Sequence, residues 1–432
     1  MKRLFALLLA VIMVLSMAAC GNKVDTATPD EPTETTPAPS GETDVAGAPL
    51  ETEPTDPTEP TDYIPEVGDG VYVKTSYTVS GEEVANNRDT VVATLADREL
   101  TVGQLQVYYW MSVYGFLNEY GAYASYFGLD LSRSLDVQKC PEGEGTWQQY
   151  FLASAVDTWR SYQGLVLQSE AENSPMDPEL QAELDSLEEN LKAAAEEGKY
   201  ASIEEMLAAD IGPGVTYEDY LAYLTVYSTG YSHYMYKCDG IEVTDDMIDA
   251  YFEENKDALA ESGVTKEEGK VVDVRHILVA IEGGTKDEEG KTTYTDEEWA
   301  TCEKDAQAIL DQWLDGGATE ESFAQLAGIC TDDPGSKETG GLYENVKTGD
   351  MVEEFDAWCF DANRKVGDYG LVKTSYGYHV MYYSGDEANW IFQCRNAVMD
   401  EKITEFVNAA ADANELVVDY EKAVLGHMDL AG

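Results

Sequence analysis

The chain has 432 residues, of which 44% are hydrophobic, and this is enough for two or three domains with apolar cores. Its 84 acidic and 27 basic residues give a formal net charge of −57 at pH 7. Such a surface repels phosphate backbones and anionic lipid head groups, which argues against nucleic-acid binding. The acidity can serve as a solubilising, salt-tolerant surface, or it can attract basic unfolded proteins or divalent cations, and both options stay open.

Residues 1–19 have the pattern of a secretory signal peptide. A basic start, Lys2-Arg3, precedes an apolar run that ends at Met17 and is too short for a comfortable membrane span. The sequence Met-Ala-Ala-Cys ending at Cys20 resembles a bacterial lipobox and predicts a lipid-modified cysteine at the mature N-terminus. Two acyl chains there would give stable membrane attachment. The alternative is an ordinary cleaved signal peptide followed by a chance cysteine.

Residues 20–68 have the composition of a disordered tether. The segment is rich in Thr, Pro and Glu and contains nine of the fourteen prolines of the chain. It cannot bury enough apolar surface to order itself, so we expect it to hold a folded body away from the membrane.

The cysteine pattern predicts no metal site. Six cysteines follow Cys20, and they show neither a CxxC spacing nor a Cys/His metal pattern. Scattered thiols of this kind are more often small buried side chains, so we assign neither a disulfide nor a metal. We also predict no cofactor.

Residues 69–270 are predicted to form a helical region that opens with a β-hairpin at residues 91–101. Thr101 and Gln104 form a capping box for the helix that follows. Apolar periodicity predicts helices over residues 101–117, 147–168, 178–197, 203–209, 217–236 and 244–261. The region is rich in Tyr, with Trp and Met interspersed, which suits either a protein-binding cleft or a plain core. His233 and His427 have no partner in the sequence, and we expect both to be structural or exposed.

Residues 271–385 are predicted to form an α+β unit with one histidine near each end. Alternating apolar residues predict a strand over 271–279 that carries His276, and residues 370–383 are again strand-like and carry His379. If these strands are neighbours in one sheet, the two imidazoles can face each other. Between them we expect a helix over 296–314, a second helix from a cap at Thr319, a turn-rich loop over 331–342 and a short helix over 349–360.

Residues 386–432 are predicted to form a C-terminal helix over 389–410 and a strand over 416–420. No internal repeat and no phosphate-binding glycine loop is visible in the sequence.

Five motifs occur in a fixed order between residues 275 and 380: R-H-I-L-V at 275–279, F-A-Q-L-A at 323–327, D-D-P-G-S followed by G-G-L at 332–342, G-x-M-V-x-x-F at 349–355, and T-S-Y-G-Y-H-V at 374–380. Together they resemble a parvulin-type peptidyl-prolyl isomerase domain. With the export signal, the tether and the flanking helices, the whole chain resembles the PrsA-like foldase lipoproteins, which are related to the periplasmic chaperone SurA.

The resemblance implies a multi-domain α and α+β fold. A mainly helical chaperone body, formed by residues 69–270 with 386–432 packing back on them, would carry an inserted parvulin-like α+β domain at 271–385. That domain would have a small antiparallel sheet flanked by helices.

The resemblance also implies a site. Apolar side chains would hold the proline ring: Leu278, Leu342, Met351 and Phe355. Polar side chains would form the floor of the site as the candidate catalytic set: His276, Asp333, Thr374 and His379. Two facing histidines joined through a threonine hydroxyl could fix each other's tautomers.

Two segments depart from the family pattern. The loop over residues 280–294 is longer and acidic, and this argues against a preference for a phosphorylated residue before proline. Residues 343–347, Tyr-Glu-Asn-Val-Lys, replace residues that are more often glycine and aromatic.

The implied function is that of a foldase on the extracytoplasmic face of a cell membrane, expected in a Gram-positive bacterium and anchored through Cys20. Its partners would be unfolded or partly folded secreted proteins with X-Pro bonds; nucleic acid would not bind, and a homodimer is left open. A holdase whose parvulin domain is a non-catalytic binding module is the alternative. A solute-binding lipoprotein would share the signal and tether, but it would not explain the five motifs.

Overall fold

The computed structural model describes residues 62–63, 73–141, 145–267, 269–286, 290 and 292–430. The predicted signal peptide, Cys20 and nearly all of the predicted tether lie outside the described residues. The chain divides into two compact units. Unit 1 comprises Met1–Ile241 and Ile403–Gly432, and unit 2 comprises Glu242–Lys402. Unit 2 therefore interrupts unit 1 in the sequence.

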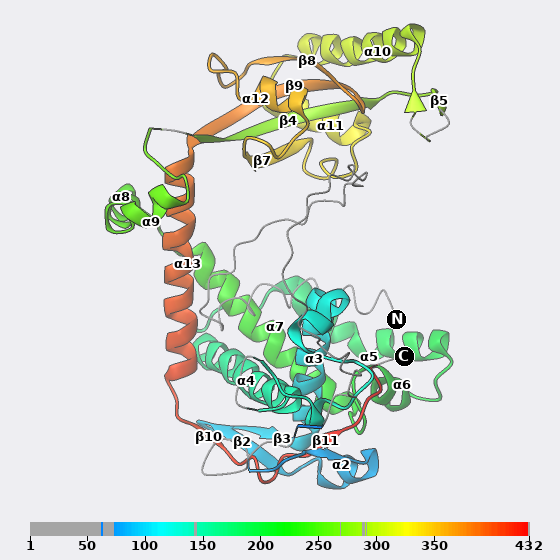
Figure 1. Cartoon of the computed structure of the whole chain (residues 1–432), viewed down its shortest axis with the longest axis vertical. Coiled ribbons are helices and arrows are strands. Elements are labelled where there is room, and N and C mark those ends of the chain that lie inside the picture. The colour runs from blue at the N-terminus through cyan, green and yellow to red at the C-terminus, as the bar shows by residue number, and fades with distance from the viewer. Residues whose placement is uncertain are drawn as a thin grey trace, which may run out of the picture. The chain divides into compact units, whose positions relative to one another are not determined.

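Unit 1 is mainly helical (Figure 1). Three of its long helices begin with capping boxes, at Thr101, Thr146 and Thr216. In each box the threonine side chain accepts from the backbone N–H three residues later, and the side chain of that later residue accepts from the backbone N–H of the threonine. The helices are α2 (Gly81–Asn87), α3 (Val102–Tyr120), α4 (Trp147–Glu172), α5 (Pro178–Gly198), α6 (Ile203–Asp210) and α7 (Tyr217–Asp239), with short 3-10 helices at Gly121–Phe127 and Leu135–Val137. The predicted helices of this region are present, most of them a few residues longer than predicted.

Strands from both ends of the chain pair in unit 1. The predicted hairpin consists of β2 (Val91–Leu95) and β3 (Arg98–Thr101), and β10 (Leu416–Val418) lies antiparallel to β2. A second, two-stranded sheet joins β1 (Thr78–Val79) to β11 (Leu425–Gly426) in parallel. The fully buried side chain of Gln106 holds the segment around β11 in place. Its amide donates to Val424 O at 2.8 Å and accepts from Gly426 N–H at 2.8 Å.

The core of unit 1 is rich in aromatic side chains. Trp147, Phe151 and Trp159 of α4 are almost fully buried. Five tyrosines along α7 stack on one another at spacings of three and four residues, with ring centroids 6.1 to 6.5 Å apart: Tyr220, Tyr223, Tyr227, Tyr231 and Tyr234. These stripes are therefore core for the most part.

Helix α13 (Asn389–Asp412) leads the chain from unit 2 back into unit 1. Its last turns pack on unit 1 through Val407 and Ala410, which cluster with Leu165 of α4 and Tyr234 of α7. The backbones of α4 and α13 approach closely, since a Cβ at Gly164 would overlap the carbonyl of Ala410.

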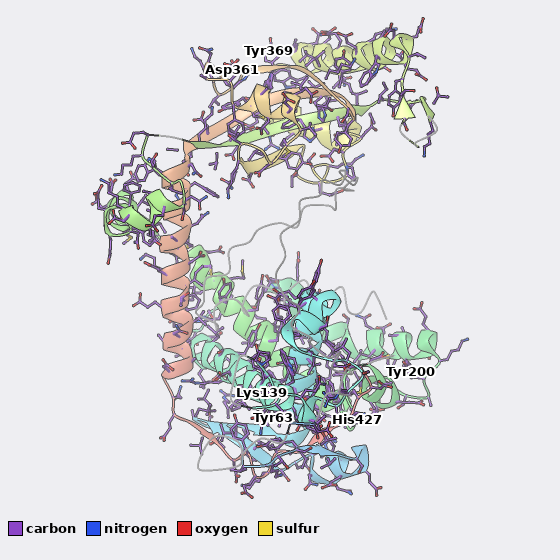
Figure 2. All side chains as sticks on the ribbon, viewed as in Figure 1. Tyr63, Lys139, Tyr200, Asp361, Tyr369 and His427 are labelled. Carbon is purple, nitrogen blue, oxygen red and sulfur yellow. The ribbon has the colours of Figure 1, made fainter. Side chains whose placement is uncertain are left out.

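The short described stretch Asp62–Tyr63 is held on unit 1. Tyr63 N–H donates to Val137 O at 2.8 Å, and Asp62 pairs with Arg133 at 2.8 Å. The ammonium of Lys139 lies 5.7 Å from the centre of the Tyr63 ring (Figure 2).

Unit 2 begins with two short helices, α8 (Asp245–Glu254) and α9 (Lys256–Glu261). The single helix predicted over 244–261 is therefore wrong at Asn255, where φ is −105° and ψ is 14°. The carbonyl of Tyr251 accepts both the backbone N–H and the side-chain amide of Asn255. Phe252 of α8 packs edge-to-face on Trp390 of α13.

The centre of unit 2 is a four-stranded antiparallel sheet in the order β7-β4-β9-β8. Its strands are β4 (Lys270–Ala280), β7 (Leu342–Val346), β8 (Tyr369–Thr374) and β9 (Gly377–Ala388). The strand-like run predicted over 370–383 is a hairpin, because the chain turns between Thr374 and Gly377. At Gly377, where φ is +146°, a Cβ would overlap the carbonyl of Val279.

Helices cover both faces of this sheet. Helices α10 (Asp296–Asp315) and α11 (Glu320–Cys330) bury Trp313 and Phe323 against Ile277, Val380 and Tyr382. Helix α12 (Glu353–Cys359) buries Phe355 and Cys359 on the opposite face, with Val272 and Met381. A small hairpin of β5 (Thr285–Lys286) and β6 (Thr292–Thr293) follows β4.

The predicted fold class is confirmed: a mainly helical body carries an inserted α+β unit built on a small antiparallel sheet. Within the part of the chain that the structure describes, none of the helices combines the length and the apolar character needed to span a bilayer.

Candidate active site

The register of the two central strands brings the predicted histidines together. His276 of β4 lies opposite Met381 of β9, and Leu278 lies opposite His379. Residues two apart on a strand share a face, so both imidazoles lie on the face covered by α12. Their Nδ1 atoms are 3.0 Å apart, and the rings are stacked with a 28° angle between their planes.

Hydrogen bonds extend this pair at both ends. His379 Nε2 lies 2.9 Å from the hydroxyl of Thr374, and His276 Nε2 lies 3.0 Å from Asp333 Oδ2. The four polar residues predicted from the sequence thus form one continuous chain. Three of them are almost fully buried, and the side chain of Asp333 is 17% exposed.

The partners fix where the protons lie in this chain. An ionised Asp333 can only accept, so His276 carries its proton on Nε2 and offers a lone pair on Nδ1. His379 must then donate from Nδ1 to His276, and its Nε2 accepts from the Thr374 hydroxyl. The Thr374 oxygen in turn accepts from Tyr376 N–H at 3.2 Å. All the bonds therefore point in one direction, toward the carboxylate.

Asp333 receives more donors than the histidine. Its Oδ2 accepts from the hydroxyls of Ser336 at 2.5 Å and Tyr343 at 2.8 Å, and its Oδ1 accepts from Gly335 N–H at 3.2 Å. Partial burial opposes ionisation, but these hydrogen bonds and the nearby His276 outweigh it and lower the pKa of Asp333 to about 2. The carboxylate is therefore ionised and fully bonded at neutral pH.

Burial keeps both imidazoles neutral. It lowers the pKa of His379 to about 4, with a further contribution from His276, and it also lowers the pKa of His276 against the opposing charge of Asp333. Because every ring nitrogen in the pair already has a partner, neither imidazole has a free donor or acceptor to offer a bound molecule.

Aromatic side chains form the wall beside this polar chain. The Phe355 ring stands edge-to-face on both imidazoles, at 5.4 Å from each. The Tyr343 ring stacks on His276 at 5.1 Å with a 20° angle between the planes. Met351 and Tyr343 are partly buried and pack on the cluster that contains Phe355. The structure thus places an apolar surface directly next to the histidine pair.

The two predicted leucines lie differently. Alternation along β4 places Leu278 on the face of His276, where it is partly buried. Leu342 is paired with Arg275, so it shares the opposite face, and the structure does not bring it to the histidines. Tyr343, one residue later, takes that place. Sequence reasoning missed Tyr343 and Ser336 as site residues, and only the period-two alternation of β7 could have indicated the former.

The loop between α11 and β7 is held by short polar contacts. The Thr331 hydroxyl accepts from Leu278 N–H at 3.1 Å and from Asp333 N–H at 3.2 Å, which fixes the start of the loop against β4. Gly341 closes it, since its N–H donates to Ser336 O at 2.7 Å. Its φ is +77°, and a Cβ there would overlap the carbonyl oxygen of His276, so the close approach requires glycine.

The acidic loop predicted over 280–294 contains the hairpin of β5 and β6, with residues 287–289 and 291 outside the described residues. Its first residue is tied to the site loop, because Ala280 N–H donates to Asp332 Oδ2 at 2.9 Å. Among the residues that the structure describes, no cluster of His, Cys, Asp and Glu side chains has an arrangement that could hold a metal ion.

Comparison with known proteins identifies the domain that contains this site. The family model of the PPIC-type PPIase domain matches residues 259–386. Foldase protein PrsA of Halalkalibacterium halodurans is 31% identical over 144 residues, which are 33% of this chain and 32% of that protein. Foldase protein PrsA of Caldanaerobacter subterraneus subsp. tengcongensis is 28% identical over 183 residues, 39% of this chain and 48% of the relative. The chain thus spans about a third to about a half of the length of these relatives.

Among solved structures, the crystal structure of PrsA from Bacillus subtilis matches with 21% identity and a TM-score of 0.31, over 64% of this chain and 89% of that one. A score this low carries no conclusion about the arrangement of the whole chain. The family match and the relatives agree with the family that the five sequence motifs resemble. Residues 259–386 therefore belong to the PPIC-type, or parvulin-type, peptidyl-prolyl isomerase domains, in a chain whose curated relatives are PrsA foldases.

Proposed function

We propose that this chain is a foldase that acts outside the cytoplasm, in which unit 2 catalyses cis/trans isomerisation of X-Pro bonds and unit 1 binds unfolded clients without ATP. The observation that carries the proposal is the unbroken hydrogen-bond chain from Thr374 through His379 and His276 to Asp333, with the Phe355 ring standing on both imidazoles. The PrsA relatives support the foldase role.

The chemistry requires neither nucleophile nor cofactor. Rotation about an X-Pro bond has a barrier of roughly 20 kcal/mol, and each ~1.4 kcal/mol that is removed speeds it tenfold. The catalyst must hold the proline ring on an apolar surface and favour the twisted amide over the planar one. Phe355, Met351 and Tyr343 supply the surface, and Leu278 lies on the same face of the sheet, whereas Leu342 lies on the other face.

The polar chain acts by position rather than by proton transfer. Both histidines are neutral and have no free nitrogen, so they hold Phe355 and the site loop in place and set the polarity beside the bound amide. Asp333 contributes a fixed negative charge that its own donors already solvate. This suits an amide rotation, in which no bond to hydrogen is made or broken.

The test is a proline-limited refolding assay combined with a short X-Pro peptide assay on the mature chain. Phe355→Ala should remove about 1 to 3 kcal/mol of transition-state binding and so lower kcat/KM about ten- to a hundredfold. Tyr369→Ala is the matched control, because that aromatic ring contacts Trp313, which packs on the other face of the sheet. Equal activity of the two variants would refute the assigned site, and an inactive wild type would favour the non-catalytic holdase instead.

Membrane attachment through Cys20 is the second part of the proposal and rests on the sequence at residues 17–20. Cys20→Ala should release the protein from the membrane fraction without unfolding it, because a tether of this composition contributes no core. If the variant stays in the membrane fraction after a carbonate wash, the lipid anchor is wrong, while the isomerase proposal is unaffected. Sedimentation of the same sample would decide between monomer and homodimer, which are both left open.

A further inference from the structure

The proposed isomerase function leaves one buried residue of the site, Ser336, without a role. The hydroxyl oxygen of Ser336 lies 2.5 Å from Asp333 Oδ2 and 3.1 Å from His276 Nε2, and these two atoms are 3.0 Å apart. The three polar atoms therefore form a small triangle at the carboxylate end of the hydrogen-bond chain. Ser336 is 0% exposed, so its hydroxyl acts on these two neighbours and not on a bound peptide.

The loop and strand β4 together fix the position of this hydroxyl. The carbonyl of Ser336 accepts from Gly341 N–H at 2.7 Å and from the hydroxyl of Thr339 at 2.9 Å. Gly341 is itself held next to β4, because His276 N–H donates to Gly341 O at 2.8 Å. The serine is thus anchored both to the strand that carries His276 and to the loop that carries Asp333.

The carboxylate of Asp333 needs such an anchor. Its terminal torsion, χ2, has a broad and roughly two-fold energy profile, so an aspartate alone does not select which oxygen faces a neighbour. Among the described residues, Oδ2 accepts from His276 Nε2 and from the hydroxyls of Ser336 and Tyr343, whereas Oδ1 accepts from Gly335 N–H. The Ser336 contact is the shortest of the four. Burial raises the pKa of Asp333, and Ser336 is foremost among the donors that lower it to about 2.

The triangle also fixes the proton of His276. Asp333 takes the Ser336 hydrogen, so the serine oxygen faces His276 Nε2 as an acceptor, as the ionised carboxylate does. Two acceptors beside one ring nitrogen favour the tautomer that carries its proton there. His379 then carries its proton on Nδ1, and its Nε2 accepts from the Thr374 hydroxyl.

The direction of this chain decides what the site offers to a bound amide. In the reversed direction, Thr374 would accept from both His379 Nε2 and Tyr376 N–H, and its own hydrogen would be free to donate. A donor beside the amide stabilises the planar form, because resonance places more negative charge on the carbonyl oxygen of the planar form than on that of the twisted form. The reversed chain would therefore slow the rotation.

We propose that Ser336 is a positioning residue for the isomerisation. It holds Asp333 Oδ2 against His276 and so keeps the hydrogen-bond chain in the direction that offers no donor to the planar amide. The inference rests on the isomerase function proposed for unit 2 and assigns a further residue to it. Because Ser336 touches no substrate atom, its effect falls on the rate of rotation and not on the affinity for the peptide.

The first experiment compares Ser336→Ala with Thr339→Val in the full-length chain in detergent. Both variants lose a hydroxyl of the same loop, but only the first loses the contacts with Asp333 and His276. On a short X-Pro peptide, Ser336→Ala should lower kcat roughly tenfold and leave KM unchanged or lower, whereas Thr339→Val should keep the wild-type kcat. A wild-type kcat in Ser336→Ala, or a raised KM with an unchanged kcat, would overturn the proposal.

Nitrogen NMR of the imidazoles gives a reading that a merely structural role would not move. The chain has four histidines, so labelling histidine alone with ¹⁵N yields few ring signals, and single His→Asn variants assign them. In the wild type at pH 7, His276 should carry its proton on Nε2 and His379 on Nδ1. Ser336→Ala should show a mixture of tautomers at both rings, while Thr339→Val keeps the wild-type pattern. A fully retained Nε2 tautomer of His276 in the serine variant contradicts the proposal, as does a proton on its Nδ1 in the wild type.

A second substitution at the same position covers an alanine variant that does not fold. Ser336→Cys keeps a side chain of similar size but replaces the hydroxyl by a weak donor, so kcat should again fall without a rise in KM. An unchanged kcat in this variant would overturn the proposal. An inactive wild type would refute the isomerase function alone, because the tautomers of His276 are measured without substrate. An active wild type with an unchanged serine variant would refute the role of Ser336 alone.

Discussion

Mild acid should destabilise unit 2 through its buried histidines. The pKa of His379 is about 4 in the fold against an ordinary value of 6.5, so below pH 6.5 the unfolded chain binds protons that the folded chain refuses. The free energy of unfolding therefore falls as the pH falls from 6.5 to 4. At pH 5 the loss from His379 alone comes to about 2 kcal/mol, and below pH 4 it reaches ~3 kcal/mol. His276, whose pKa is also lowered, acts in the same direction.

Hydrogen exchange of the β4 and β9 amides at pH 7 and pH 5, corrected for intrinsic exchange, measures this loss within unit 2. The matched variant is His379→Asn, which keeps a neutral polar side chain but cannot take up a proton. It should be less stable than the wild type at pH 7 and should lose clearly less stability between the two pH values. The many surface carboxylates titrate alike in both proteins and cancel. Equal losses in wild type and variant would refute the assignment of the acid sensitivity to the histidine pair.

Three further outcomes are expected. Tyr343→Phe removes one hydrogen-bond donor from the Asp333 carboxylate, so it should raise the pKa of Asp333 above about 2 and lower the free energy of unfolding in urea by roughly 1 to 2 kcal/mol. An unchanged unfolding midpoint would show that this hydrogen bond contributes nothing to stability. Gly341→Ala should lower the Tm of unit 2 far more than Gly349→Ala. Both glycines have positive φ, but only at Gly341 would a Cβ overlap the backbone carbonyl of His276. Equal Tm shifts in calorimetry would contradict the close approach of Gly341 to His276. Deletion of residues 271–384 should leave a folded helical body that slows client aggregation, since Lys270 pairs with Ala388 where the chain enters and leaves the sheet; a product without a cooperative melting transition would refute this.

Capping and periodicity predicted the helices because both signals are local. Thr101 with Gln104 forms the expected capping box, and the helix from Trp147 begins at the predicted residue. The break at Asn255 was missed because the apolar spacing continues across it. The backbone leaves the helical region at Asn255, and an asparagine in a sequence does not show whether its backbone will do so.

The polar half of the site could be predicted and the apolar half only in part. Motif order identified His276, Asp333, Thr374 and His379, and the strand register then placed them in contact. Leu342 lies on the other face, because a shift of one residue in a strand moves a side chain across the sheet. Register depends on pairing with a distant strand, which no single stretch of sequence contains.

Pairing of the chain ends in unit 1 sets an order of events in folding. The buried amide of Gln106 hydrogen-bonds to Val424 and Gly426, which lie more than three hundred residues later in the sequence. Strand β1 likewise pairs with β11, which is synthesised much later. A chain that emerges N-terminus first holds all of unit 2 before these partners appear. Unit 2 can therefore fold while unit 1 still exposes an unmet polar group and open strand edges. Residues 416–426 complete unit 1 once they have emerged, and before then it is most open to aggregation and proteolysis.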